Sequence, residues 1–133
     1  MSQLNSFLPA GKAGNPPNAS EIPILSELKE CYLVWHSFLV PMPKITRNTL
    51  GVKVDGFFVD ILELGLTAQY TKRDQKLALL LDISRKLDTL KYFITILWEA
   101  KGLTGSKYGQ LGQKLVSTGK MLGKWIQSIK ETP

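Results

Sequence analysis

Cysteine and histidine are almost missing from this sequence of 133 residues, which contains only Cys31 and His36. One cysteine cannot form an internal disulfide, and one histidine without a cysteine or acid at ligand spacing does not make a zinc site. No second histidine is present to activate a serine or cysteine nucleophile. We therefore expect no catalytic residue, no metal and no cofactor. Cys31 is expected to be a small buried side chain, and His36 a core or boundary residue.

Long apolar runs are also missing. Runs such as LALLLDI are far shorter than the ~20 residues that span a bilayer, and the N-terminus has no charged segment followed by an apolar one. These absences predict a cytoplasmic protein without a membrane partner. The formal net charge of +6 and the pI of about 9.5 favour anionic partners, namely nucleic acid, acidic protein surfaces or anionic lipid.

Acidic residues are absent between Lys101 and Lys130, a stretch that contains six lysines. Its apolar residues fall within about a third of a helical wheel, which predicts an amphipathic helix with a basic back; they are Tyr108, Leu111, Leu115, Leu122, Trp125, Ile126 and Ile129. A solvated helix commonly places Glu near Lys for a few tenths of a kcal/mol per pair. This stretch does not, so we predict that it binds phosphates. A basic face that only keeps the helix soluble is the alternative.

Basic residues of the third and fourth helical segments form the predicted surface for nucleic acid or a polymerase. They are Arg73, Arg85, Lys86, Lys91, Lys107, Lys114, Lys120, Lys124 and Lys130. Aromatic residues are few and lie mostly on apolar faces, so the stacking platforms of single-strand readers are not evident. Salt-sensitive binding to the phosphate backbone is the expected mode.

Helical periodicity predicts the fold. A first helix includes Ile24 and ends before Pro41, a second runs from Arg47 to Tyr70, and a third ends near Gly102. Thr71 and Asp74 have the spacing of a capping box for the third helix. No stretch alternates with period two for long. With the basic helix, these segments predict an all-α, antiparallel up-down four-helix bundle over residues 22–131.

The flanking segment 1–21 is rich in proline and glycine and is predicted to be a disordered N-terminal tail. The alternative is a short docking peptide that uses Leu4, Phe7 and Leu8. Within the helical segments, glycines lower helix propensity by about 1 kcal/mol each, so we expect them to mark close helix contacts. They are Gly56, Gly65, Gly105, Gly109, Gly112, Gly119 and Gly123. Leu66 is placed on the apolar side of its helix, as are Leu81 and Trp98.

Three stretches resemble a known family. They are LGVKVDGFFVDILELGLTAQYT after PMPKITRN, LLLDISRKLDTLKYFITILWEAKGLT, and LVSTGKMLGKWIQSIK. They are similar to the four-helix-bundle family that includes the ribosomal-RNA intervening-sequence proteins, and nearest to the accessory variability determinant of diversity-generating retroelements. The resemblance covers residues 24–130.

This resemblance implies a basic, barrel-shaped homopentamer of four-helix bundles without a catalytic site. Such proteins bind the reverse transcriptase of the retroelement and its template RNA or DNA, and they support mutagenic reverse transcription and retrohoming. The family has no fixed binding motif to transfer, so the choice of lysines and arginines rests on charge placement alone. A bundle of the same family with a structural role and no nucleic-acid partner is the alternative.

Overall fold

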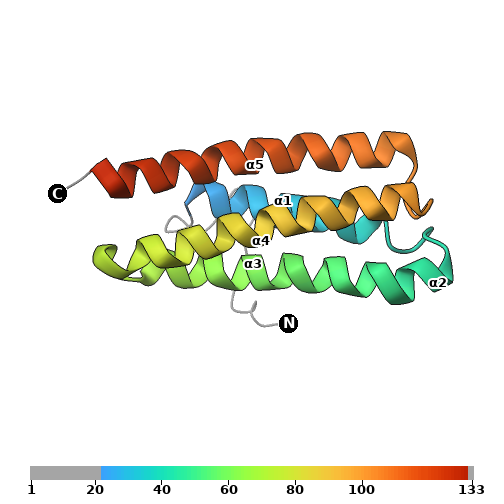
Figure 1. Cartoon of the computed structure of the whole chain (residues 1–133), viewed down its shortest axis with the longest axis horizontal. Coiled ribbons are helices and arrows are strands. Elements are labelled where there is room, and N and C mark those ends of the chain that lie inside the picture. The colour runs from blue at the N-terminus through green and yellow to red at the C-terminus, as the bar shows by residue number, and fades with distance from the viewer. Residues whose placement is uncertain (1–21, 132–133) are drawn as a thin grey trace, which may run out of the picture.

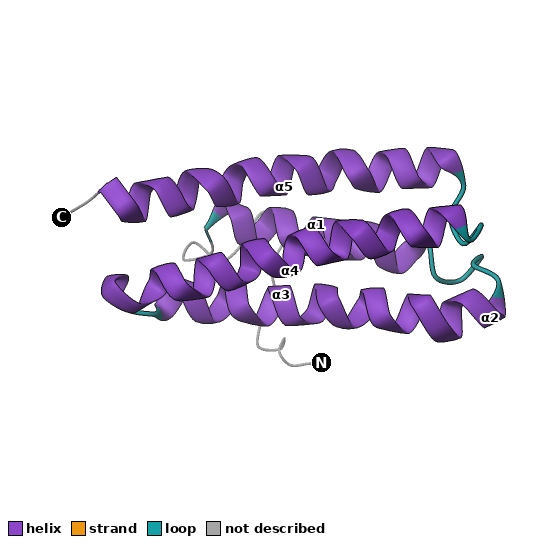
Figure 2. Ribbon diagram, viewed as in Figure 1, coloured by secondary structure: helices purple, strands orange, loops and turns teal. Residues whose placement is uncertain are grey.

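The structure is a computed structural model that describes residues 22–131, all of it helices and short connections (Figures 1 and 2). The predicted tail, residues 1–21, lies outside the described residues. The elements are α1 (Pro23–Ser37), α2 (Lys44–Thr46), the π-helical turn η1 (Arg47–Gly51), α3 (Val52–Tyr70), α4 (Arg73–Glu99) and α5 (Gly105–Glu131). No strand occurs in this part of the chain, which confirms the all-α helical bundle.

Consecutive long helices run in opposite directions, and each packs beside the next. α3 contacts α4, α4 contacts α5, and α1 closes the bundle against α5 and α3. In Figure 1, α5 lies along one edge and α3 along the opposite edge, while α4 crosses in front of α1. The outer faces of α3 and α5 therefore point away from each other.

The core forms where the apolar stripes of these helices meet. Trp35 of α1 and Phe58 of α3 are fully buried, and their rings stack with centroids 6.0 Å apart. The indole Nε1 of Trp35 donates a hydrogen bond to Asp55 Oδ1 at 3.1 Å, so the polar atom of this large side chain is satisfied. Cys31 is buried, as predicted from its apolar neighbours.

The second helical segment begins three residues before the predicted start at Arg47, because Lys44 opens α2 and the helix continues through the π-helical turn into α3. A single-turn π segment inserts one residue into an α-helix. Arg47, the first residue of this turn, contacts the connection that follows α1: its Nη1 donates to Leu39 O at 3.2 Å and to Val40 O at 3.0 Å. Arg47 thus satisfies two backbone carbonyls of the connection between α1 and α2.

The predicted capping box at the start of α4 is wrong. The N-cap residue is Lys72, and no side chain caps the helix. The Thr71 hydroxyl instead donates to the carbonyl of Thr67 in the preceding turn, at 2.6 Å. Because α3 ends only at Tyr70, the Thr71 hydroxyl is within reach of its last carbonyls, and this local bond competes with a cap.

α4 ends with a Schellman motif, near the predicted end at Gly102. The N–H of Gly102 donates to Leu97 O at 2.8 Å, and the N–H of Lys101 donates to Trp98 O at 2.9 Å. The residue in the left-handed conformation is Lys101, with φ 69°, rather than the glycine beside it. A residue with a Cβ is less stable there than glycine.

Replacing Lys101 with glycine should therefore raise the free energy of unfolding by about 1 kcal/mol, since it removes the left-handed strain. Urea denaturation followed by circular dichroism measures the change. Ala100→Gly is the matched control, because Ala100 has an ordinary φ of −83° and gains nothing from glycine. An equal gain in both variants, or a loss in Lys101→Gly, would show that the left-handed residue is not strained.

Most glycines in the helices do not mark close contacts, contrary to the prediction. A Cβ built on Gly56, Gly105, Gly109, Gly112 or Gly123 meets nothing within 4 Å, and one on Gly119 makes only ordinary contacts. Gly65 is the exception, because its Cβ would lie 2.7 Å from Leu25 Cδ2.

Three residues assigned to apolar faces are exposed as well. Leu66 is 55% exposed, Leu81 42% and Trp98 40%. Together with the glycines, they show that several helix faces have no partner within the described chain.

Candidate nucleic-acid interface

The basic residues of α5 stand on a helix held by one apolar face. Leu111, Leu115 and Leu122 are buried against the bundle, together with Thr118, which the sequence analysis did not place in the core. Lys120, Lys124 and Lys130 are exposed. Among residues 22–131, Lys114 is the only residue of α5 that forms an ion pair. The first acidic residue of α5 is Glu131. The predicted basic back of this helix therefore exists.

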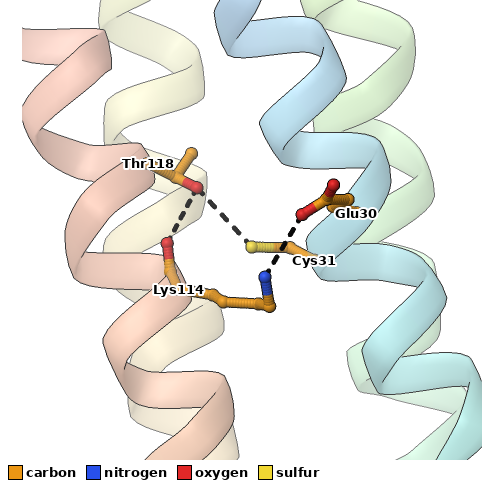
Figure 3. Close-up of polar contacts among 4 residues, drawn as sticks. All are labelled: Glu30, Cys31, Lys114 and Thr118. Carbon is orange, nitrogen blue, oxygen red and sulfur yellow. Dashed lines mark hydrogen bonds and ion pairs between the residues drawn. The ribbon is translucent and has the colours of Figure 1, made fainter.

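Lys114 is not uncompensated, contrary to the prediction (Figure 3). Its Nζ lies 3.3 Å from Glu30 Oε1 on α1, and this hydrogen bond raises the pKa of Lys114 above its ordinary value. Its backbone carbonyl accepts a hydrogen bond of 2.9 Å from the Thr118 hydroxyl. Glu30 is 84 residues away in the sequence, so a charge pattern along α5 alone could not reveal the pair.

The same contact region contains the buried thiol of Cys31. Its Sγ lies 3.5 Å from Thr118 Oγ1, and together they link α1 to α5 (Figure 3). Burial raises the pKa of Cys31, which keeps the thiol protonated and unreactive. The cluster of Glu30, Cys31, Lys114 and Thr118 thus joins α1 to α5. Because Lys114 is already paired with Glu30, it is a weaker candidate for phosphate binding than the exposed lysines.

Lys91 and Lys120 are brought together by the groove between α4 and α5. Both line a hollow of about 300 Å³ with Asp88 and Gly119, and Lys91 also lines an adjoining hollow of about 470 Å³. Lys124 lies one helical turn beyond Lys120. Of the nine predicted residues, Lys91 and Lys120 therefore line one groove, and Lys124 follows Lys120 on α5.

The remaining predicted residues lie on other surfaces. Lys86 faces the opposite flank of α4, where it lines a hollow with Asp60 and Glu63 of α3. Arg85 forms an ion pair of 2.7 Å with Asp82 on its own helix.

Two further basic residues are held near the two ends of the bundle. Arg73 Nη2 donates to the carbonyl of Ser128 at 3.1 Å, and Lys107 Nζ lies 5.4 Å from the ring centroid of Phe38. The nine residues therefore do not form one continuous patch.

An aromatic stack beside the groove was missed in the sequence analysis. The rings of Trp98 and Tyr108 are parallel within 2°, with centroids 4.5 Å apart, and Tyr108 lines the larger hollow. The Tyr108 hydroxyl lies 2.9 Å from Thr95 Oγ1, which fixes its ring. Trp98 and Tyr108 are ten residues apart in the sequence and lie in two different helices, α4 and α5. Helical periodicity relates residues within one helix, so it could not predict this contact.

The described residues 22–131 contain no group of three or more His, Cys, Asp or Glu side chains placed to hold a metal ion. None of their helices is both long and apolar enough to cross a lipid bilayer.

Comparisons of the chain with protein-family models, curated proteins and solved structures give no match. The fold alone defines the class of protein, which is a small helical bundle in which α5 is basic. The family resemblance remains a hypothesis that rests on the residues quoted for it.

Proposed function

We propose that this protein is a non-enzymatic accessory subunit that binds the phosphate backbone of structured RNA. The observation that carries the proposal is the exposed surface of α5 up to Lys130, which has no acidic residue. On it, Lys120 and Lys124 follow one another on successive turns, beside a hollow that Lys91 and Asp88 of α4 also line. Following the family resemblance, the partners are the reverse transcriptase and template RNA of a diversity-generating retroelement, whose mutagenic copying the subunit supports.

The physical basis is the release of counter-ions from the nucleic acid. Each lysine that neutralises a phosphate frees condensed cations, so affinity falls steeply with salt. Like charges on one face also repel one another, and a bound polyanion removes that repulsion.

The double variant Lys120→Glu/Lys124→Glu should weaken RNA binding by about tenfold or more, and the log–log salt dependence should fall by roughly one per lysine. Fluorescence anisotropy with a structured RNA, over a series of salt concentrations, measures both quantities. Lys44→Glu/Lys53→Glu is the matched control, because it makes the same change in net charge on α2 and α3. Circular dichroism and light scattering verify that the fold and the molecular mass are unchanged.

Equal weakening by both double variants would mean that net charge, not this face, attracts the RNA. Binding that does not depend on salt, or no RNA binding by the unchanged chain, would leave a bundle with a structural role. Co-purification with the reverse transcriptase of a neighbouring gene and with its transcript tests whether the reverse transcriptase is a partner. Loss of the polymerase but not of RNA in the Lys120→Glu/Lys124→Glu variant would assign this face to protein.

A further inference from the structure

The larger hollow between α4 and α5 has the form of a ligand site. Its volume of about 470 Å³ falls in the range of small-molecule sites, and its wall is mostly apolar, with Ile94, Leu115 and Val116 among its residues. The hollow is open because α5 has Gly109 and Gly112 on this wall, where an added Cβ would meet nothing within 4 Å. Both glycines lower helix propensity, and the packing of the bundle does not require them.

Tyr108 gives this hollow an aromatic wall whose position is fixed. Trp98 covers one face of the Tyr108 ring, and Tyr108 also lines the hollow. The Thr95 hydroxyl donates its only proton to the carbonyl of Lys91 at 3.2 Å, so the Tyr108 hydroxyl donates to Thr95 Oγ1, 2.9 Å away. The Tyr108 oxygen is then left as an acceptor. Gln113 also lines the hollow, is exposed, and adds an amide that can donate or accept.

Positive charge adjoins this hollow, and the described residues that line it include no acid. Lys91 lines both this hollow and the smaller one of about 300 Å³, where Lys120 and Asp88 are also found. A Cβ on Gly119 would lie 3.4 Å from Lys91 Nζ, so the ammonium lies against α5. From Gly112 to Lys120 the helix rises by about 12 Å, a distance that one nucleic-acid strand covers in a few nucleotides.

We propose that the larger hollow takes one unpaired nucleobase of the bound RNA, stacked on Tyr108, while Lys91 and Lys120 hold the adjoining phosphates. This inference rests on the proposed function, and it adds base recognition to a surface assigned there to phosphates. An unpaired base costs least to seat, because no pairing has to be broken first. Loops and bulges are therefore the preferred RNA elements. The hollow beside α3 lacks this combination, because Asp60 and Glu63 line it and would repel phosphate.

The test compares two RNA hairpins that differ only at one bulged nucleotide, which carries uracil in one hairpin and no base in the other. Both hairpins present the same phosphates, so the base alone distinguishes them. Stacking on an aromatic ring is tolerant of sequence, because every base has a π-face. Measured by fluorescence anisotropy, the unchanged chain should bind the hairpin with the bulged uracil about tenfold more tightly than the abasic hairpin.

Gly112→Leu adds a side chain to the wall of the hollow and should remove this preference. Its binding to the abasic hairpin, and the salt dependence of that binding, should stay unchanged because the lysines are untouched. Gly56→Leu on α3 is the matched control, since a Cβ meets nothing within 4 Å there either. It should keep the full preference. Circular dichroism verifies that both variants remain helical.

Photo-cross-linking locates the base directly. With 5-iodouracil as the bulged base, irradiation of the complex should attach the RNA to α5 within residues 108–114, which trypsin releases by cleavage after Lys107 and Lys114. Mass spectrometry identifies the modified peptide. A cross-link that maps to any other peptide would place the base elsewhere and overturn the inference.

The binding results separate this inference from the proposed function. Equal affinity of the unchanged chain for the two hairpins, or a full preference in Gly112→Leu, overturns the base site. If binding to both hairpins still weakens with salt in those cases, the proposed function stands without it. If neither hairpin binds, the proposed function fails and the base site fails with it.

Discussion

Replacing Trp35 with alanine should lower the free energy of unfolding by about 3–5 kcal/mol. The indole is 0% exposed, stacks on Phe58 and donates a hydrogen bond to Asp55. Alanine would leave a large cavity between α1 and α3 and would deprive the half-buried Asp55 carboxylate of a donor. Urea denaturation monitored by circular dichroism measures the loss.

Trp98→Ala is the matched control for this substitution. Trp98 is 40% exposed and stacks on Tyr108, so its truncation removes one aromatic contact without opening an internal cavity. It should cost about 1 kcal/mol. A loss at Trp35 no larger than the loss at Trp98 would contradict the assignment of Trp35 to the centre of the core.

Replacing Gly102 with alanine should lower the free energy of unfolding by about 1–3 kcal/mol. An added Cβ would lie 2.7 Å from Leu97 Cδ1 and 2.8 Å from Thr46 Cγ2. Leu97 is 0% exposed and cannot move aside, so the clash would separate the α4–α5 connection from α2. The glycine is required here by close approach of two segments, and not by a left-handed backbone.

Gly105→Ala is the control for this second substitution, since a Cβ there meets nothing within 4 Å. It should leave stability unchanged or raise it slightly through helix propensity. Thermal and urea denaturation of both variants give the comparison. A Gly102→Ala protein as stable as the unchanged chain would mean that the connection between α4 and α5 adapts freely.

The helical bundle could be predicted because each helix leaves a pattern of apolar residues in its own short stretch of sequence. Helical spacing of apolar residues identifies the buried faces of α1 and α5, and Pro41 and Pro43 mark the connection that follows α1. The π-helical turn from Arg47 to Gly51 was not predicted, since helical spacing of apolar residues does not distinguish it from an α-helix. The left-handed residue was also missed, because Gly102 is the residue type that usually occupies that position.

The candidate site was predictable only in part. The absence of acids between Lys101 and Lys130 identified a basic face, and this face is exposed at Lys120 and Lys124. The pairing of Lys114 with Glu30 depends on how α1 packs against α5, and a sequence pattern carries no information about that packing. The other basic residues are dispersed for the same reason. The apolar face of each helix is buried in the bundle, and this orientation determines the surface on which its basic side chains lie.

The order of contacts in the bundle has a consequence for how the chain folds. α3, α4 and α5 each pack on a neighbour in sequence, so two helical hairpins can form with short loop closures. The contact between Cys31 and Thr118, 87 residues apart, requires the longest closure. We therefore expect the three-helix hairpin array to condense first and α1, the shortest long helix, to dock last and detach first.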